Sequence, residues 1–187
     1  MINEAPFFQT KQTHILEGSS GQAVEVAFSV SPTKGFVKED ESWINYRRNY
    51  FEIRCNISLM SRLNQGSTRL SVDGQGQVVG FHLVISAITT DGKDADLIQF
   101  TSQRSKGPRS TPSPLLVPLK DGPASVVFKR LQFHRATPKY NSPTRPKKHY
   151  LLKIQLMADF ISTQSMCISD ATSLPFLVRG RSPVHFS

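Results

Sequence analysis

Apolar and polar residues alternate with a period of two along most of this chain. The clearest example is residues 150–160, where one side carries Tyr150, Leu152, Ile154, Leu156, Ala158 and Phe160. Lys153, Gln155 and Asp159 fall on the other side. Successive side chains of a β-strand leave opposite faces of the sheet, so this pattern predicts a half-buried antiparallel strand.

The same alternation recurs at residues 24–30, 51–59, 81–87 and 127–133. In the last of these, Val127, Leu131 and Phe133 are expected on the buried face. Asp-Gly turns at 73–74, 91–92 and 121–122 separate the runs. No stretch of a dozen residues has a helical stripe, and short helical turns stay open only near 59–64 and 170–174. The pattern predicts an all-β protein, either an antiparallel β-sandwich or a barrel.

Two segments are rich in proline and in basic residues, 105–118 and 134–149. They are predicted to be long loops beside the strands. Long ordered loops on a rigid scaffold often carry function. The alternative is that they are surface excursions without a role.

Composition fits one globular domain over residues 1–187. The chain has 187 residues, of which 38% are hydrophobic and 20% charged. The 2 cysteines cannot form a disulfide framework, which favours a reducing compartment. The first residues do not resemble a signal peptide, and no apolar run reaches the length of a membrane span. We therefore expect a soluble intracellular protein without membrane contact.

The positive charge is concentrated in one part of the chain. The formal net charge is +9, yet residues 97–158 alone hold twelve basic residues and one acid, Asp121. A solvated surface normally intersperses both signs. Contact with a polyanion such as a nucleic-acid backbone therefore explains the bias better than a merely solvated face does.

No catalytic constellation is visible. The 5 histidines lack cysteine companions at zinc-ligand spacing, and neither a phosphate-binding loop nor a nucleophile elbow occurs. Gly74, Gly76 and Gly80 imitate a dinucleotide fingerprint at the wrong spacing, in a hairpin context. We expect no enzyme activity, no metal, no cofactor and no small-molecule substrate.

Four segments together resemble a known family. They are a Tyr-Arg-Arg-Asn-Tyr-Phe block within 43–51, a Gln-Arg-Ser-Lys-Gly-Pro run within 97–108, Lys-Arg-Leu-Gln-Phe at 129–133 and a closing Arg-Gly-Arg-Ser-Pro within 175–183. Their order and content resemble the PhoG-like, Ndt-type DNA-binding domain over about 43–183. That family includes fungal regulators of meiosis, sporulation and nutrient response, and the animal myelin regulatory factor.

The resemblance implies an immunoglobulin-like β-sandwich that binds double-stranded DNA as a monomeric, fungal-type transcription factor in the nucleus. It also implies a C/A-rich recognition element. By the family motif, Arg48 and Arg104 read guanines in the major groove, a task that suits the rigid donor fork of arginine. A guanidinium also stacks on the pyrimidine before such a guanine.

The remaining expected contacts are basic residues of the same segments. Arg47 and Arg130 are expected to contact DNA, and Arg179 and Arg181 either contact DNA or hold the last strand in place. Phosphate contacts, which fix register without reading sequence, are expected from Lys106, Arg109, Lys147 and Lys148. An alternative for Arg47 or Arg48 is to brace a carboxylate such as Glu41. Trp43, Tyr46, Tyr50 and Phe51 are expected to pack rather than to stack on bases.

Two departures from the family pattern keep a second function open. The segment between Arg109 and Lys129 is short where family members carry a long insertion, and no basic residue precedes Lys11. The runner-up is therefore a basic β-sandwich that binds a protein partner or RNA without DNA sequence specificity.

Overall fold

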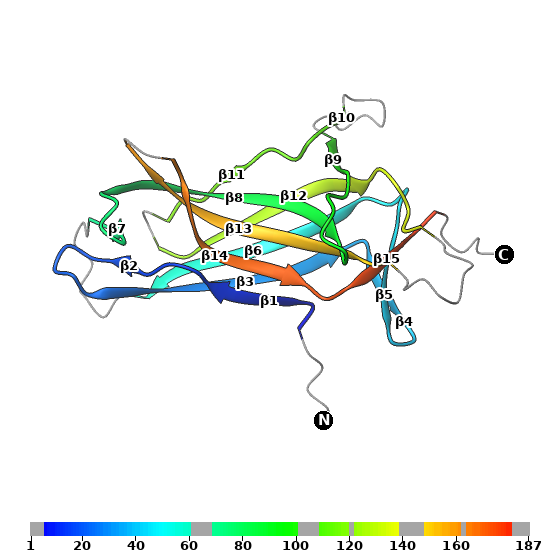
Figure 1. Cartoon of the computed structure of the whole chain (residues 1–187), viewed down its shortest axis with the longest axis horizontal. Helices are drawn as coiled ribbons and strands as arrows, with labels where there is room; N and C mark the ends of the chain where they lie inside the picture. The colour runs from blue at the N-terminus through cyan, green and yellow to red at the C-terminus, as the bar shows by residue number, and fades with distance from the viewer. Residues whose placement is uncertain are drawn as a thin grey trace.

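The computed structural model describes residues 6–60, 69–100, 109–119, 122–138, 148–161 and 164–180, and its regular structure consists of β-strands. The strands form two sheets that pack face to face (Figure 1). The predicted all-β sandwich is confirmed. Within the described ranges, no helix is long and apolar enough to cross a membrane.

The first sheet has eight strands. They are β1 (Phe8–Gln12), β4 (Phe36–Glu39), β5 (Ser42–Tyr46), β8 (Val78–Thr89), β11 (Leu115–Leu116), β13 (Tyr150–Phe160), β14 (Met166–Ser173) and β15 (Phe176–Arg179). The long strand β13 lies at its centre, paired with β8 along one edge and with β14 along the other.

The second sheet has seven strands in the order β10-β9-β12-β6-β3-β2-β7. They are β2 (Leu16–Glu17), β3 (Ala23–Lys34), β6 (Phe51–Met60), β7 (Ser71–Val72), β9 (Leu97–Phe100), β10 (Arg109–Ser110) and β12 (Ala124–Phe133). Strand β12 pairs with β6 along most of its length and with β9 over its last residues.

The core lies between the sheets and is made by the inward positions of the alternating runs. The predicted inward residues of β6, β8 and β13 are buried, apart from the half-buried Leu59 at the end of β6. Aromatic rings fill one end of the core, where Phe51 stacks on Phe133 with centroids 5.1 Å apart and Phe133 contacts Phe176 at 5.5 Å. Burying such rings contributes about 1.5–3 kcal/mol each.

The predicted inward face of one strand was wrong in part, and a helical turn that the sequence left open is replaced by a strand. The predicted inward face of β12 is correct at Leu131 and Phe133, but Phe128 is buried in place of the half-buried Val127. A β-bulge between Phe128 and Leu131 adds a residue, so the inward positions change from even to odd numbers. The helical turn left open near 170–174 is instead part of β14 and the residue after it.

The segment before the family-like motifs is part of the same sandwich. Strand β1 pairs with β14, and Phe7 just before it is buried. The Phe7 ring lies 4.8 Å from Trp43 and 5.1 Å from Phe36, measured between ring centroids. Trp43 therefore packs, as predicted.

One strand pair departs from the expected antiparallel arrangement. Strand β15 runs parallel to β5, with Arg179 opposite Tyr46. The pairing places Arg179, the first residue of the closing motif, beside Tyr46, the first residue of the Tyr-Arg-Arg block, although the two are far apart in sequence. Figure 1 shows β4, β5 and β15 together at one end of the sandwich.

Candidate nucleic-acid interface

Arg48 lies in the tight turn that joins β5 to β6, and its side chain is exposed. The amide of Asn49 donates to the carbonyl of Tyr46 at 2.8 Å and closes the turn. The side-chain amide Nε2 of Gln132, from β12, donates to the Arg48 carbonyl at 2.7 Å. The turn is thus held by its own backbone and by a strand of the second sheet.

Arg130 occupies the bulge of β12. Its φ is 59°, in the left-handed region that residues with a Cβ adopt at a cost of about 1–2 kcal/mol. The bulge takes Arg130 out of the regular alternation of the strand, between Phe128 and Leu131. Residues with strained backbone conformations are concentrated at functional sites, so Arg130 is a candidate functional residue.

Tyr50 connects these two arginine-bearing segments. It follows the Arg48 turn directly, and Cζ of Arg130 lies 5.4 Å from the centroid of its ring. This cation–π contact is worth about 0.5–1 kcal/mol where it is solvent-exposed. Tyr46 and Phe51 are buried as predicted, whereas Tyr50 is half-buried and supports a candidate contact residue.

The end of β9 reaches the same ring. Phe100 packs edge-on against Tyr50 with centroids 5.3 Å apart. Arg104 and Lys106 follow in the sequence but lie outside the described residues, as do Lys147 and Arg181. The backbone of Arg109 begins β10, opposite Phe100. We call Arg48, Tyr50, Phe100 and Arg130 the Tyr50 cluster.

Arg47 has a different environment from Arg48. Its side chain is half-buried, and its Nη1 donates to the carbonyl of His134 at 3.3 Å. Its backbone amide donates to the carbonyl of Arg179 at 2.9 Å. These bonds connect the turn to β15 and to the end of β12, so they fit a supporting role better than a brace on Glu41.

Arg179 forms an ion pair with Glu39 of β4, with Nη1 and Oε2 2.5 Å apart. The hydroxyl of Tyr46 donates to the other carboxylate oxygen of Glu39. The Tyr46 hydrogen bond, followed by the Arg179 guanidinium, lowers the pKa of Glu39 despite some desolvation. This triad fits the alternative in which Arg179 holds the last strand in place, and its contact with DNA stays a prediction.

Lys148 precedes β13 and pairs with Asp91 in the turn after β8, with Nζ and Oδ2 2.6 Å apart. The hydrogen bonds from Lys148 and from the Thr89 hydroxyl lower the pKa of Asp91 to about 2. Lys148 is therefore engaged within the protein, and a phosphate contact would have to compete with Asp91.

Sequence reasoning missed the neighbours that shape the Tyr50 cluster. Gln132 and the bulge were not predicted, although the change of parity between Phe128 and Leu131 is a signal that could have revealed the bulge. Two exposed cations on adjacent strands, Arg54 of β6 and Lys129 of β12, were not singled out either. The outward position of Arg54 could have been read from the alternation. Lys129 shares the odd numbering of the predicted inward residues Val127, Leu131 and Phe133, so its exposure could not be read without knowledge of the bulge.

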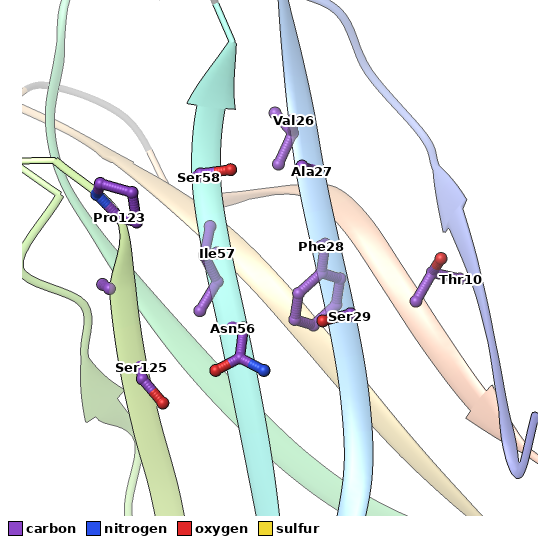
Figure 2. A pocket seen from close by; sticks show the side chains of 11 residues that line it. Thr10, Val26, Ala27, Phe28, Ser29, Asn56, Ile57, Ser58, Pro123 and Ser125 are labelled. Carbon is purple, nitrogen blue, oxygen red and sulfur yellow. The ribbon is translucent and has the colours of Figure 1, made fainter.

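A shallow hollow of about 490 Å³ lies over β3, β6 and β12 (Figure 2). Ser29, Asn56 and Ser125 form a row across these strands, in register with one another. The residues that line the hollow include no carboxylate, histidine or cysteine. Within the described ranges, no cluster of such side chains is arranged to hold a metal ion. The arginines at the end of the sandwich are therefore a better candidate site than this hollow.

Most of this chain matches a family of known proteins. A family model described as NDT80 / PhoG like DNA-binding family matches residues 42–187. The meiosis-specific transcription factor NDT80 of Saccharomyces cerevisiae is 29% identical over 109 residues, which cover 53% of this chain and 17% of that protein.

Two further relatives match over a larger part of the chain. Transcription factor vib-1 of Neurospora crassa is 27% identical over 166 residues, 75% of this chain and 24% of its own length. An uncharacterized protein of Dictyostelium discoideum is 29% identical over 170 residues, 83% of this chain and 15% of its own length. The chain thus spans less than a quarter of each relative.

Proposed function

Because the chain belongs to the NDT80 / PhoG like DNA-binding family, we propose that it is a sequence-specific double-stranded DNA-binding domain of a transcription factor. Two of its relatives are transcription factors by name. DNA binding by such a protein implies action in the nucleus. The family is described by DNA binding rather than by a reaction, which agrees with a function without catalysis.

The observation that carries the proposal is the arrangement of the Tyr50 cluster. The exposed Arg48 stands on a turn closed by two hydrogen bonds, and Arg130 lies over the neighbouring Tyr50 ring. Guanidinium groups held on a rigid scaffold lose little conformational freedom on binding. This is what bidentate recognition of guanine O6 and N7 requires.

Arg104 completes the proposed reading set. It follows β9 by four residues, and the last residue of that strand, Phe100, contacts Tyr50. We propose that Arg48 and Arg104 read guanines while Lys106, Arg109 and Lys147 hold phosphates. The concentration of positive charge in residues 97–158 supports a large electrostatic share of the affinity.

The proposed target is a C/A-rich element, and the proposed state is a monomer acting as one domain. The name of the yeast relative assigns that protein to meiosis. For this chain the proposal is regulation of transcription through binding to DNA.

The test is an anisotropy titration of the domain against two labelled duplexes, one with a C-A-C-A-A-A core and one scrambled. Both duplexes are titrated at two salt concentrations, because affinity for DNA depends on salt. We expect at least about a hundredfold preference for the first duplex. Equal, salt-steep binding to both duplexes and to random-library DNA would contradict base reading. Preference for RNA would instead favour the basic interaction module.

A further inference from the structure

Two glutamines hold the main chain beside the two arginines of the Tyr50 cluster. Gln132 Nε2 donates to the carbonyl of Arg48 at 2.7 Å, and Gln99 Nε2 donates to the carbonyl of Lys129 at 3.1 Å. Gln99 is in β9 and Gln132 in β12, at adjacent register positions of the strand pair. Each glutamine thus reaches from one segment to a carbonyl of another.

The peptide group between Arg48 and Asn49 is bonded at both ends. Its carbonyl accepts from Gln132, and its N–H, which belongs to Asn49, donates to Tyr46 at 2.8 Å. A planar peptide group fixed at both ends cannot rotate without breaking one of these bonds. Because this plane follows the Arg48 Cα, the bonds restrict the ψ of Arg48 and with it the direction of the side chain.

The peptide group before Arg130 is held in an analogous way. The Lys129 carbonyl belongs to the peptide that sets the φ of Arg130, and this φ is the strained value of 59°. The bulge disrupts the ladder between Phe128 and Leu131, and the Gln99 amide bonds the Lys129 carbonyl there. The Oε1 of Gln99 in turn accepts from the amide of Ser113 at 3.2 Å, which fixes the glutamine itself.

We propose that Gln132 and Gln99 are positioning residues of the DNA interface, Gln132 for Arg48 and Gln99 for Arg130. The inference rests on the proposed function and adds to it the groups that set the direction of the arginines. Bidentate recognition requires the guanidinium plane to match the base edge, so a loosened main chain loses specificity before it loses general affinity.

The first test uses the free protein and therefore does not depend on DNA binding. Hydrogen exchange of the Asn49 amide is followed by NMR in the wild type, in Gln132→Met and in Gln155→Met. Methionine keeps the length of the side chain but lacks the amide. Gln155 is a half-buried glutamine of β13 in the opposite sheet and is the matched control. We expect Asn49 to exchange about fivefold faster in Gln132→Met only, and an unchanged rate would overturn the clamp.

The second test measures specificity on the duplex that the wild-type domain selects from a random library. Gln132→Met is expected to lower the ratio of selected to scrambled affinity about five- to tenfold, with the salt slope unchanged because the phosphate contacts remain. A uniform loss on both duplexes would indicate a merely structural role and overturn the proposal. If the wild-type domain prefers the selected duplex and Gln132→Met leaves the ratio of the two affinities unchanged, the positioning role of Gln132 is overturned while the proposed function stands.

A double-mutant cycle separates positioning from direct contact of the glutamine with a base. If Gln132 acts through Arg48, Gln132→Met has no further effect on the ratio in an Arg48→Ala background. Additive losses would show that Gln132 reads DNA by itself and would overturn the positioning role. The same cycle with Gln99→Met and Arg130→Gly tests the second pair. If the wild type selects no sequence at all, the proposed function fails and the specificity role falls with it, while the exchange test still reports on the clamp.

Discussion

The guanidinium of Arg130 lies over the ring of Tyr50, with Cζ 5.4 Å from the ring centroid. This contact joins a strained bulge in β12 to the segment just after the Arg48 turn. Arg130 has a φ of 59°, a conformation that costs free energy for a residue with a Cβ atom. The backbone strain at Arg130 therefore destabilises the fold, whereas the contact of its side chain with Tyr50 stabilises it.

Replacing Arg130 by glycine and by alanine separates the two effects. Both variants lose the guanidinium, but only glycine relieves the left-handed backbone. We expect Arg130→Gly to be more stable than Arg130→Ala by about 1 kcal/mol in urea unfolding, the reverse of the usual order within a strand. An alanine variant as stable as the glycine variant would show that the bulge changes shape when the arginine is removed.

The affinities of Arg130→Gly and Arg130→Ala for DNA should not follow the order of their stabilities. Both Arg130 variants are expected to bind the preferred duplex about equally weakly, because each has lost the same cation. Tight binding by either would exclude Arg130 as a contact.

Arg104 and Lys106 are predicted to have different roles although only one residue separates them. We expect Arg104→Ala to lose about 1–3 kcal/mol on the preferred duplex and little on scrambled DNA. Lys106→Ala should weaken both duplexes alike and lower the salt slope by about one. If Arg104→Ala loses the same affinity on both duplexes, Arg104 contacts a phosphate rather than a base.

Glu39 offers a test of whether Arg179 holds a strand or contacts DNA. If Arg179 holds β15 through the ion pair, Glu39→Gln and Arg179→Ala should both lower the urea midpoint and leave DNA affinity nearly unchanged. If Arg179 contacts DNA, Arg179→Ala weakens binding while Glu39→Gln, which frees the guanidinium and removes a nearby negative charge, strengthens it. Anisotropy at one salt concentration distinguishes the two outcomes.

The Lys148–Asp91 pair predicts a pH dependence of stability. The folded pKa of Asp91 is about 2, below its ordinary value of 3.8, so the pair stabilises the fold above pH 4 and loses this effect as the pH falls towards 2. Asp91→Asn should therefore lower the urea midpoint at pH 6 and make little difference near pH 2. Asp94→Asn is the control. Asp94 lies in the same segment between β8 and β9, but it forms no ion pair within the described ranges. If the urea midpoint of Asp91→Asn stays below that of the wild type by the same amount from pH 6 to pH 2, the lowered pKa of Asp91 is contradicted.

The two free cysteines should differ in reactivity. Cys55 is buried, and desolvation raises the pKa of its thiol to about 12, whereas Cys167 is half-buried. Because the thiolate is the reactive form, a thiol reagent at pH 8 should label Cys167 in the native protein and Cys55 only after unfolding. Cys167→Ser should then show no native labelling. Two labels at similar rates would indicate local opening of β6.

Much of the fold was predictable because the alternation of side chains is a local property of a strand. The inward faces of β6, β8 and β13 followed directly from residues two apart. Phe128 was mispredicted because a bulge costs one residue of register, and the apolar pattern on either side of it still looks regular. The family could be inferred from short motifs because each motif is a contiguous run of residues that can be read directly in the sequence. Some of these residues are brought together by the fold at one end of the sandwich.

Pairings between distant segments could not be predicted in this way. The parallel contact of β15 with β5 and the ion pair of Arg179 with Glu39 each join segments more than a hundred residues apart. The same applies to Gln132 and Arg48, whose hydrogen bond spans 84 positions.

The sequence by itself determined the long strands with clear alternation, the sign and location of the charge, and the family. The tertiary structure decided which arginines stand free and which are held. Arg48 is exposed on its turn, Arg130 is directed onto Tyr50, and Arg179 is paired with Glu39. The physical reason is that composition fixes how much charge a chain carries, while the environment of each charge depends on hydrogen bonds and ion pairs that form only when the sheets come together.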